Sequence, residues 1–151
     1  DEKMVEIGVT RIIIGTALFP ENYIQDLKNN FDANQIVLAL DFKLINNTPT
    51  IYTHGWQDNS DIPLYQFLSD QPFYSNILAT DISLDGAMEG PSFDVYRDLL
   101  HLFPSINLIA SGGIRSFDDL NILKSMNIKE AIIGKAIYEK NISLRDLAND
   151  Y

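Results

Sequence analysis

Five short apolar segments, each followed by a loop and a helix-like segment, constrain the fold of this chain more than any other feature. They carry few charges, as strands that are buried on both faces of a sheet do. Strands separated by helices pair in parallel, because the chain must cross back before the next strand begins. The sequence therefore predicts an α/β fold with a parallel sheet, whose strands are residues 11–15, 35–41, 77–81, 106–111 and 130–134.

The segments between these strands predict helices and one hairpin. Residues 42–56 alternate between apolar and polar side chains around Asn46 and Asn47, which is typical of a β-hairpin. Pro63 is tolerated in the first turn of a helix, and Ser92 stands where an N-cap is expected. The expected helices are residues 21–30, 61–68, 93–103, 116–126 and 143–149, with a helical turn at 135–139 and the end of a further helix at 1–8.

An internal repeat narrows the architecture. The sequence I-I-I-G-T-A at residues 12–17 returns as A-I-I-G-K-A at residues 131–136, and both read as a strand, a glycine and the start of a helix. A doubled β-α pattern of this kind indicates a (β/α)8 TIM barrel made from two similar halves. A Rossmann sheet is the alternative, but no G-x-G-x-x-G motif follows a predicted strand.

Composition excludes several classes of protein. With 151 residues, 46% of them hydrophobic, the chain should form a single domain with a sizeable core. It has no cysteine, which rules out thiolate metal sites and fits a cytoplasmic location, and His54 and His101 are too isolated to suggest a metal. No apolar run is long enough to span a membrane, and the first residues do not resemble a signal peptide. The net charge of −10 argues against nucleic acid and anionic membranes, so a phosphorylated ligand would need locally placed donors.

Glycines at the ends of two consecutive strands suggest such a phosphate site. Gly112 and Gly113 follow the fourth predicted strand, and Gly134 ends the fifth. Glycine lets a phosphate approach the backbone, where free N–H groups bind it without net positive charge. The loops after strands seven and eight are a common phosphate site in (β/α)8 enzymes. Gly15 and Thr16 could form half of a second site, and the alternative for all of these glycines is a tight turn.

Polar side chains at the carboxyl ends of two strands are candidates for catalysis. Asp41 ends an otherwise apolar strand, where a barrel enzyme can place a general acid or base; the alternative is a turn or capping role. Thr80 and Asp81 end the next strand, and because side chains alternate, one faces the barrel mouth and the other the helices. Trp56, the single tryptophan, lies in a polar loop and could stack on a ligand or fix the loop.

Five motifs together resemble one known family. They are A-L-D-F from Ala39, T-H-G-W-Q from Thr53, T-D-I-S-L-D-G-A-M-E-G-P from Thr80, A-S-G-G-I-R-S from Ala110 and I-I-G-K-A-I-Y-E from Ile132. In this order they are similar to the phosphoribosylformimino-5-aminoimidazole carboxamide ribotide isomerases of histidine biosynthesis, from about residue 5 onward. Members of that family are (β/α)8 barrels of about 240 residues. The resemblance implies that the five predicted strands are strands four to eight and that strands one to three are missing.

The resemblance also implies an activity and roles for single residues. The family catalyses an Amadori rearrangement of an aminoaldose to an aminoketose without a cofactor. Asp41 matches the strand-five aspartate, the general acid, and Thr80 matches a threonine that assists at strand six, whereas the strand-one aspartate has no counterpart here. Trp56 matches the tryptophan of the strand-five loop. The other matches are Asp85 and Gly86 in the substrate loop, Gly112, Gly113, Gly134 and Lys135 in one phosphate cradle, and Gly15 and Thr16 in half of the other.

Two alternatives stay open. The cyclase subunit of imidazole glycerol phosphate synthase shares the fold and the phosphate pattern, but it would carry T-S-I-D where this chain has T-D-I. A phosphate-binding half-barrel module without catalysis is the other. The isomerase hypothesis implies a small bis-phosphorylated substrate and a monomeric full-length protein, whereas these 151 residues alone could pair through open sheet edges.

Overall fold

The computed structural model describes residues 8–15, 21–53, 55 and 57–150. The strands are β1 (Ile12–Gly15), β2 (Ile36–Ile45), β3 (Thr48–Thr53), β4 (Asp58–Pro63), β5 (Asn76–Asp81), β6 (Asn107–Ser111) and β7 (Glu130–Ile132). The helices are α2 (Glu21–Asn30), α3 (Leu64–Asp70), α4 (Phe93–Leu102), α5 (Phe117–Ser125), α6 (Lys135–Tyr138) and α7 (Leu144–Asp150), with a 3-10 turn, η1, at Ala33–Gln35. The helix expected at residues 1–8 falls almost wholly outside the described residues.

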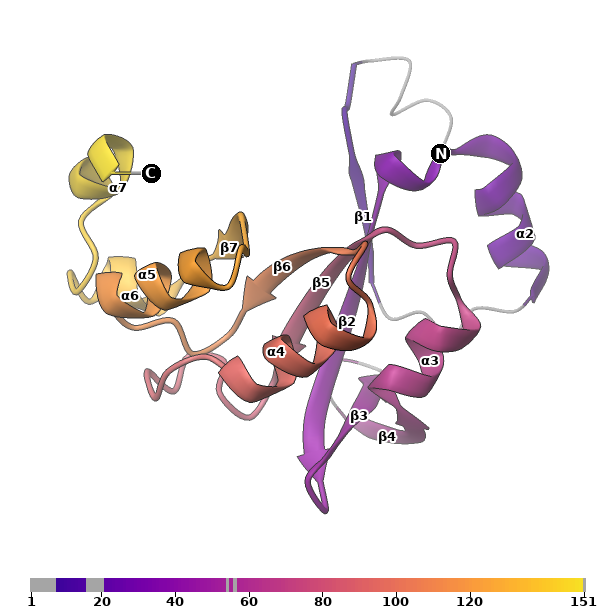
Figure 1. Ribbon diagram of the computed structural model, residues 1–151, viewed down its shortest axis with the longest axis horizontal. Coiled ribbons are helices and arrows are strands. Elements are labelled where there is room, and N and C mark those ends of the chain that lie inside the picture. Colours follow the sequence, from indigo (N-terminus) through magenta and orange to yellow (C-terminus); the bar gives the residue numbers. More distant parts are fainter. Residues whose placement is uncertain (1–7, 16–20, 54, 56, 151) are drawn as a thin grey trace.

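Five strands pair in parallel in the order β1-β2-β5-β6-β7, so the predicted parallel α/β sheet is confirmed. β2 is long enough to pair with β1 through its first residues and with β3 through its last ones. Within the described part of the chain, β1 and β7 each pair with one neighbour. The strands therefore form an open arc and not a closed barrel (Figure 1).

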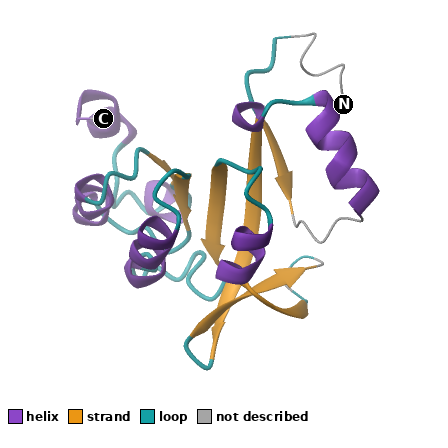
Figure 2. Ribbon diagram, turned by 45° about the vertical axis from the view of Figure 1, so that its right-hand side comes forward, coloured by secondary structure: helices purple, strands orange, loops and turns teal. Residues whose placement is uncertain are grey.

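The predicted hairpin is present at the end of β2. Asn46 and Asn47 connect β2 to β3 with φ angles of 49° and 63°, a left-handed conformation that asparagine tolerates better than most residues. β4 then pairs with β3, so the excursion has one strand more than expected and projects from one end of the sheet (Figure 2).

The helix predicted at residues 61–68 begins three residues later, because Asp61 and Pro63 belong to β4. A residue that precedes proline is pushed away from helical angles, which favours an extended Ile62. Asp61 has a φ of 59°, and the Asn59 side chain accepts a hydrogen bond from its N–H group (2.8 Å). Pro63 is extended and stands as the N-cap of α3.

The two faces of the sheet pack into separate apolar layers. Leu38, Leu40 and Phe42 are fully buried in the main core, which includes residues of α3, α4 and α5. Their neighbours point the other way, because side chains alternate along a strand. Val37 on β2 contributes to a second, smaller cluster that also contains Leu78 and Ile109. We call the side of this second cluster the inner face, since it corresponds to the face that lines the axis of a barrel.

A polar network crosses the inner face at the amino ends of the strands. Arg11, just before β1, donates two hydrogen bonds to Glu130 at the start of β7 (3.1 and 2.9 Å). Asn107 donates to the Glu130 carboxylate (3.0 Å) and to the Asn76 side chain (3.1 Å), and Asn76 donates to the backbone carbonyl of Ile36 (3.2 Å). Side chains thus connect the two outermost parallel strands, which do not pair with each other.

Candidate functional site

Three polar residues form a row at the carboxyl ends of the central strands. Asp41 is the register partner of Thr80, and Thr80 is the register partner of Ser111. Residues paired in this way point to the same side of a sheet, and alternation places all three on the inner face. Thr80 and Ser111 are buried, and Asp41 is partly exposed. The row therefore offers a carboxylate and two hydroxyl groups on one surface.

Asp81 faces the opposite way and has a different role. It is buried, and its carboxylate accepts hydrogen bonds from the Ser83 N–H group (3.0 Å), the Ser83 hydroxyl (2.6 Å) and the Ser92 hydroxyl (2.5 Å). These bonds order both ends of the loop between β5 and α4, residues 82–92, which we call the β5–α4 loop. Ser92 is the N-cap of α4 as expected, but its hydroxyl bonds to Asp81 and makes no capping bond.

Six of the residues singled out by sequence line one pocket of about 260 Å³ beside this row. They come from three segments, namely the β5–α4 loop, the turn after β6 and the start of α6. Ser111 lines the same pocket, which therefore adjoins the polar row. The six are Asp85, Gly86, Gly112, Gly113, Gly134 and Lys135.

The turn after β6 and the β5–α4 loop fit together so closely that the turn needs glycine. Gly113 has a φ of 77°, and a Cβ atom there would collide with the backbone carbonyl of Gly90. Gly112 has a φ of 93°, and its Cβ would lie 3.0 Å from the Asp81 carbonyl oxygen. The Gly90 N–H group donates to the Gly113 carbonyl (3.0 Å). Gly134 differs, because no heavy atom lies within 4 Å of its added Cβ.

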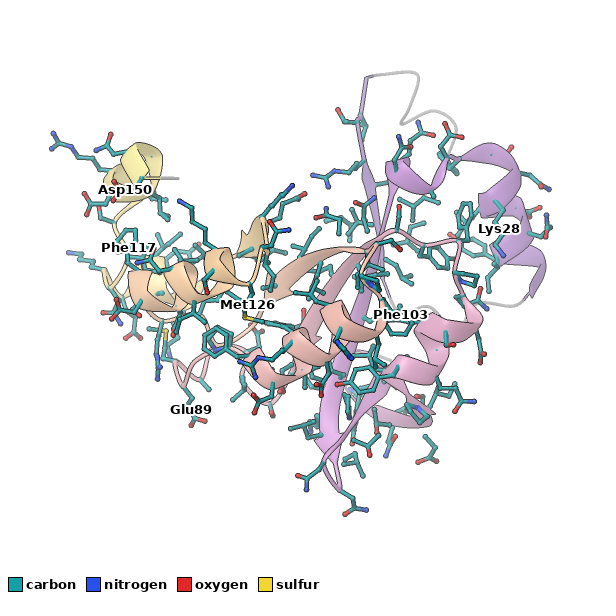
Figure 3. The ribbon with its side chains drawn as sticks, in the orientation of Figure 1. Lys28, Glu89, Phe103, Phe117, Met126 and Asp150 are labelled. Atoms are coloured by element: carbon teal, nitrogen blue, oxygen red, sulfur yellow. The ribbon has the colours of Figure 1, made fainter. Side chains whose placement is uncertain are left out.

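Two cations hold the β5–α4 loop at different points. Lys135 Nζ donates to the Gly86 carbonyl (3.2 Å) at the edge of the pocket. Arg115 Nη1 donates to the Glu89 carbonyl (3.1 Å), and the Glu89 side chain extends outward from the loop (Figure 3). Arg115 is itself positioned by Asp119, which is 1% exposed, accepts a hydrogen bond from the Arg115 N–H group (3.0 Å) and forms an ion pair with Arg115 Nε (3.2 Å).

The other predicted site residues are not brought to this pocket by the described structure. Gly15 ends β1 and pairs with Ala39, so β2 and β5 separate it from β6. Thr16 and Trp56 lie outside the described residues. Sequence reasoning missed Ser111 as a site residue, although Ser111 ends its strand as Thr80 does and is its register partner in the structure.

Metal and membrane features are not found in the part of the chain that the structure describes. No group of three histidine, cysteine, aspartate or glutamate side chains is placed to hold a metal ion there. The same residues include no helix that is long and apolar enough to cross a bilayer.

Comparison with known proteins identifies the family. The family model described as "Histidine biosynthesis protein" matches residues 2–143. A relative from Francisella philomiragia, named 1-(5-phosphoribosyl)-5-((5-phosphoribosylamino)methylideneamino) imidazole-4-carboxamide isomerase, is 41% identical over 96% of this chain and 61% of its own length. Proteins of the same name from Elusimicrobium minutum (37% identical, 92% of this chain, 59% of the relative) and Legionella pneumophila strain Corby (36%, 93% and 60%) are similar too.

The matches cover nearly all of this chain, but the chain spans only about 60% of the length of these curated relatives. The (β/α)8 barrel is the fold of the family, and the open parallel arc corresponds to part of such a barrel. On the extent of the family match and on these identities, the chain belongs to the histidine biosynthesis protein family.

Proposed function

We propose that the intact protein containing this chain is an isomerase that converts the aminoaldose of its bis-phosphorylated imidazole carboxamide substrate into an aminoketose. The names of the relatives supply the substrate and the reaction type. One observation in the structure supports this proposal for the present chain. Asp41 and Thr80 are register partners on the inner face, and the next strand in the row leads directly into the glycine-lined pocket.

Asp41 serves as the general acid in this proposal. Opening the sugar ring leaves negative charge on the ring oxygen, and a carboxylic acid within hydrogen-bond reach can protonate it. Thr80, on the adjacent strand, offers a hydroxyl to the same region. The base that removes the C2 proton is expected from strand one of the barrel. Asp81 does not fill that role, because it faces the helices and accepts three hydrogen bonds in the β5–α4 loop.

The pocket is proposed to hold one phosphate of the substrate. Its volume of about 260 Å³ lies just below the usual range of roughly 300–1,000 Å³ for sites that enclose a whole small molecule, so it suits one end of the ligand. Backbone N–H groups next to glycines bind phosphate without requiring bulk positive charge. That agrees with a chain whose net charge is −10. Lys135 would add one cation at the rim.

The proposed wider context follows from the family. The five parallel strands would be strands four to eight of one barrel domain, and Gly15 with Thr16 would form half of a second phosphate cradle. Trp56 would contact the substrate from the loop after β3. We expect no cofactor, a cytoplasmic protein, and a monomer when the barrel is complete.

Asp41→Asn in the intact protein tests the proposal. The amide keeps the shape of the side chain but cannot donate an acidic proton, so kcat should fall by about 10²–10⁴-fold. Asp61→Asn is the matched control, because Asp61 is exposed in β4 and its left-handed backbone suits asparagine. Conversion would be followed by chromatographic separation of aminoaldose and aminoketose. Normal turnover by Asp41→Asn would contradict the assignment, and ammonia-dependent ring closure by the unaltered protein would indicate a cyclase instead.

A further inference from the structure

A tyrosine hydroxyl on α4 bonds to the backbone of both strands that carry Thr80 and Ser111. Tyr96 is fully buried, and its hydroxyl donates toward the Ser111 carbonyl (2.8 Å) and also lies 3.2 Å from the Ala79 carbonyl. The Ser111 N–H group donates to the same oxygen (3.1 Å). One hydroxyl thus bridges β5 and β6.

These contacts lie immediately before the functional groups in the chain. Ala79 precedes Thr80, and Ser111 precedes the Gly112–Gly113 turn that lines the pocket. Two of the three contacts involve the backbone of Ser111, so the hydroxyl acts more on the turn than on Thr80. Because the turn packs against Gly90 with almost no free space, a small shift of Ser111 must move the walls of the pocket.

The protonation of the Tyr96 hydroxyl suits a constant role as a hydrogen-bond donor and acceptor. Burial raises the pKa of the Tyr96 hydroxyl, and the nearby Asp81 carboxylate adds to this increase. The hydroxyl therefore stays protonated throughout the neutral range and can donate to a carbonyl while accepting from an N–H group. A phenylalanine of the same shape would leave the Ser111 N–H group without this partner in a buried place, which is unfavourable unless the backbone moves.

We infer that Tyr96 is a positioning residue, which holds Ser111 and the Gly112–Gly113 turn in the geometry that binds the substrate phosphate. The inference rests on the proposed function for the identity of the ligand. It predicts that loss of the hydroxyl weakens phosphate binding more than it slows the chemical step, because Tyr96 does not reach the inner face where Asp41 and Thr80 lie.

Tyr96→Phe in the intact protein tests this, with Tyr74→Phe as the matched control. Tyr74 is also buried, but its hydroxyl has no hydrogen-bond partner within the described structure, so removing it should change neither binding nor activity. Val95→Ala, a second control, truncates another buried side chain of α4 and lowers stability without touching β5 or β6 by a hydrogen bond. Tyr96→Phe should raise KM about tenfold and weaken the affinity for inorganic phosphate by a similar factor, while kcat changes less than threefold. Both controls should keep these values within twofold.

Phosphate binding, measured by NMR titration of the Gly112 and Gly113 amides, needs no turnover and therefore separates the two proposals. If the unaltered protein binds phosphate but does not isomerise the substrate, the proposed function is contradicted. The positioning role of Tyr96 is then tested by the NMR titration of the Tyr96→Phe protein. Unchanged KM and phosphate affinity in a folded Tyr96→Phe protein would overturn the inference. Failure of Tyr96→Phe to fold even with a stabilising osmolyte would also overturn it, since the hydroxyl would then be needed by the whole fold. Absence of phosphate binding in the unaltered protein would overturn it too.

Discussion

Replacement of Gly113 by alanine should lower the free energy of unfolding, and the backbone angle and close contacts of Gly113 allow the loss to be worked out. At a φ of 77°, alanine is less favourable than glycine by about 1–2 kcal/mol. The added methyl group would also collide with the Gly90 carbonyl, so the β5–α4 loop must move. That movement breaks the 3.0 Å bond from the Gly90 N–H group to the Gly113 carbonyl, which contributes about 0.5–1.5 kcal/mol. We expect a loss of about 2–3 kcal/mol, or about 4–12 °C in Tm for a domain of this size.

Gly134→Ala is the informative counterpart, because it separates binding from folding. Its backbone is not left-handed, and the added methyl group would meet no heavy atom within 4 Å. The Tm should therefore change by less than about 2 °C. If a phosphate approaches the backbone at this position, however, the methyl group obstructs it, and we expect KM to rise at least about tenfold, equivalent to about 1.4 kcal/mol.

The two variants are compared by thermal melts and steady-state kinetics, with inorganic phosphate as a competitive inhibitor. A Gly113→Ala protein with the same Tm as the unaltered protein would refute the reasoning about the collision with Gly90. A Gly134→Ala protein with unchanged KM and unchanged inhibition by phosphate would refute the cradle. Only the second result bears on function, since Gly113→Ala is expected to disturb the loop whether or not a ligand binds there.

Two further predictions concern ion pairs. Arg11 and Asn107 hold the pKa of the Glu130 carboxyl below its usual value, so the stability that Glu130 contributes is present above that value and is lost as the pH falls through the lowered one. Glu130→Gln should therefore lower Tm at about pH 7 and have a progressively smaller effect as the pH falls through the acid range, and an effect that does not change with pH would contradict the ion pair. Asp119→Asn removes the charge of the ion pair with Arg115 and weakens the hydrogen bond from the Arg115 N–H group, so it should lower the free energy of unfolding in urea by about 1–2 kcal/mol. An unchanged midpoint would show that this contact does not stabilise the loop.

Much of the fold could be predicted from the sequence, because strands buried on both faces appear as continuous apolar runs. The hairpin was also predictable, since Asn46 and Asn47 suit a two-residue turn. The start of α3 was not. Pro63 is compatible both with the first turn of a helix and with an extended residue before it. Two hydrogen bonds favour the extended form in β4: the Ser60 hydroxyl donates to the Ile51 carbonyl, and the Asp61 N–H group donates to the Asn59 side chain.

The pocket was partly predictable, because loops at the carboxyl ends of parallel strands converge at one edge of a sheet. The contacts that hold it were not. Tyr96 bonds to Ser111, fifteen residues later, through a side chain that no periodicity distinguishes from the rest of the buried face of α4. Ser92 stands at the predicted N-cap, yet its hydroxyl bonds to the buried Asp81 carboxylate, because a buried charge needs hydrogen-bond donors more than an exposed helix end does.

We propose that this arc is part of a closed barrel, and the layers on its inner face support that proposal. Polar groups occupy the amino end, an apolar cluster lies in the middle, and the row from Asp41 to Ser111 occupies the carboxyl end. Side chains that fill a barrel are arranged in layers of this kind. The apolar layer is complete only over the central strands, since Ile13 on β1 and Ile132 on β7 stay 64% and 46% exposed. Strands added beyond β1 and β7 would cover both isoleucines and pair the two strand edges that have no partner among the described residues, whereas a freestanding parallel arc would leave apolar surface and unpaired backbone in water.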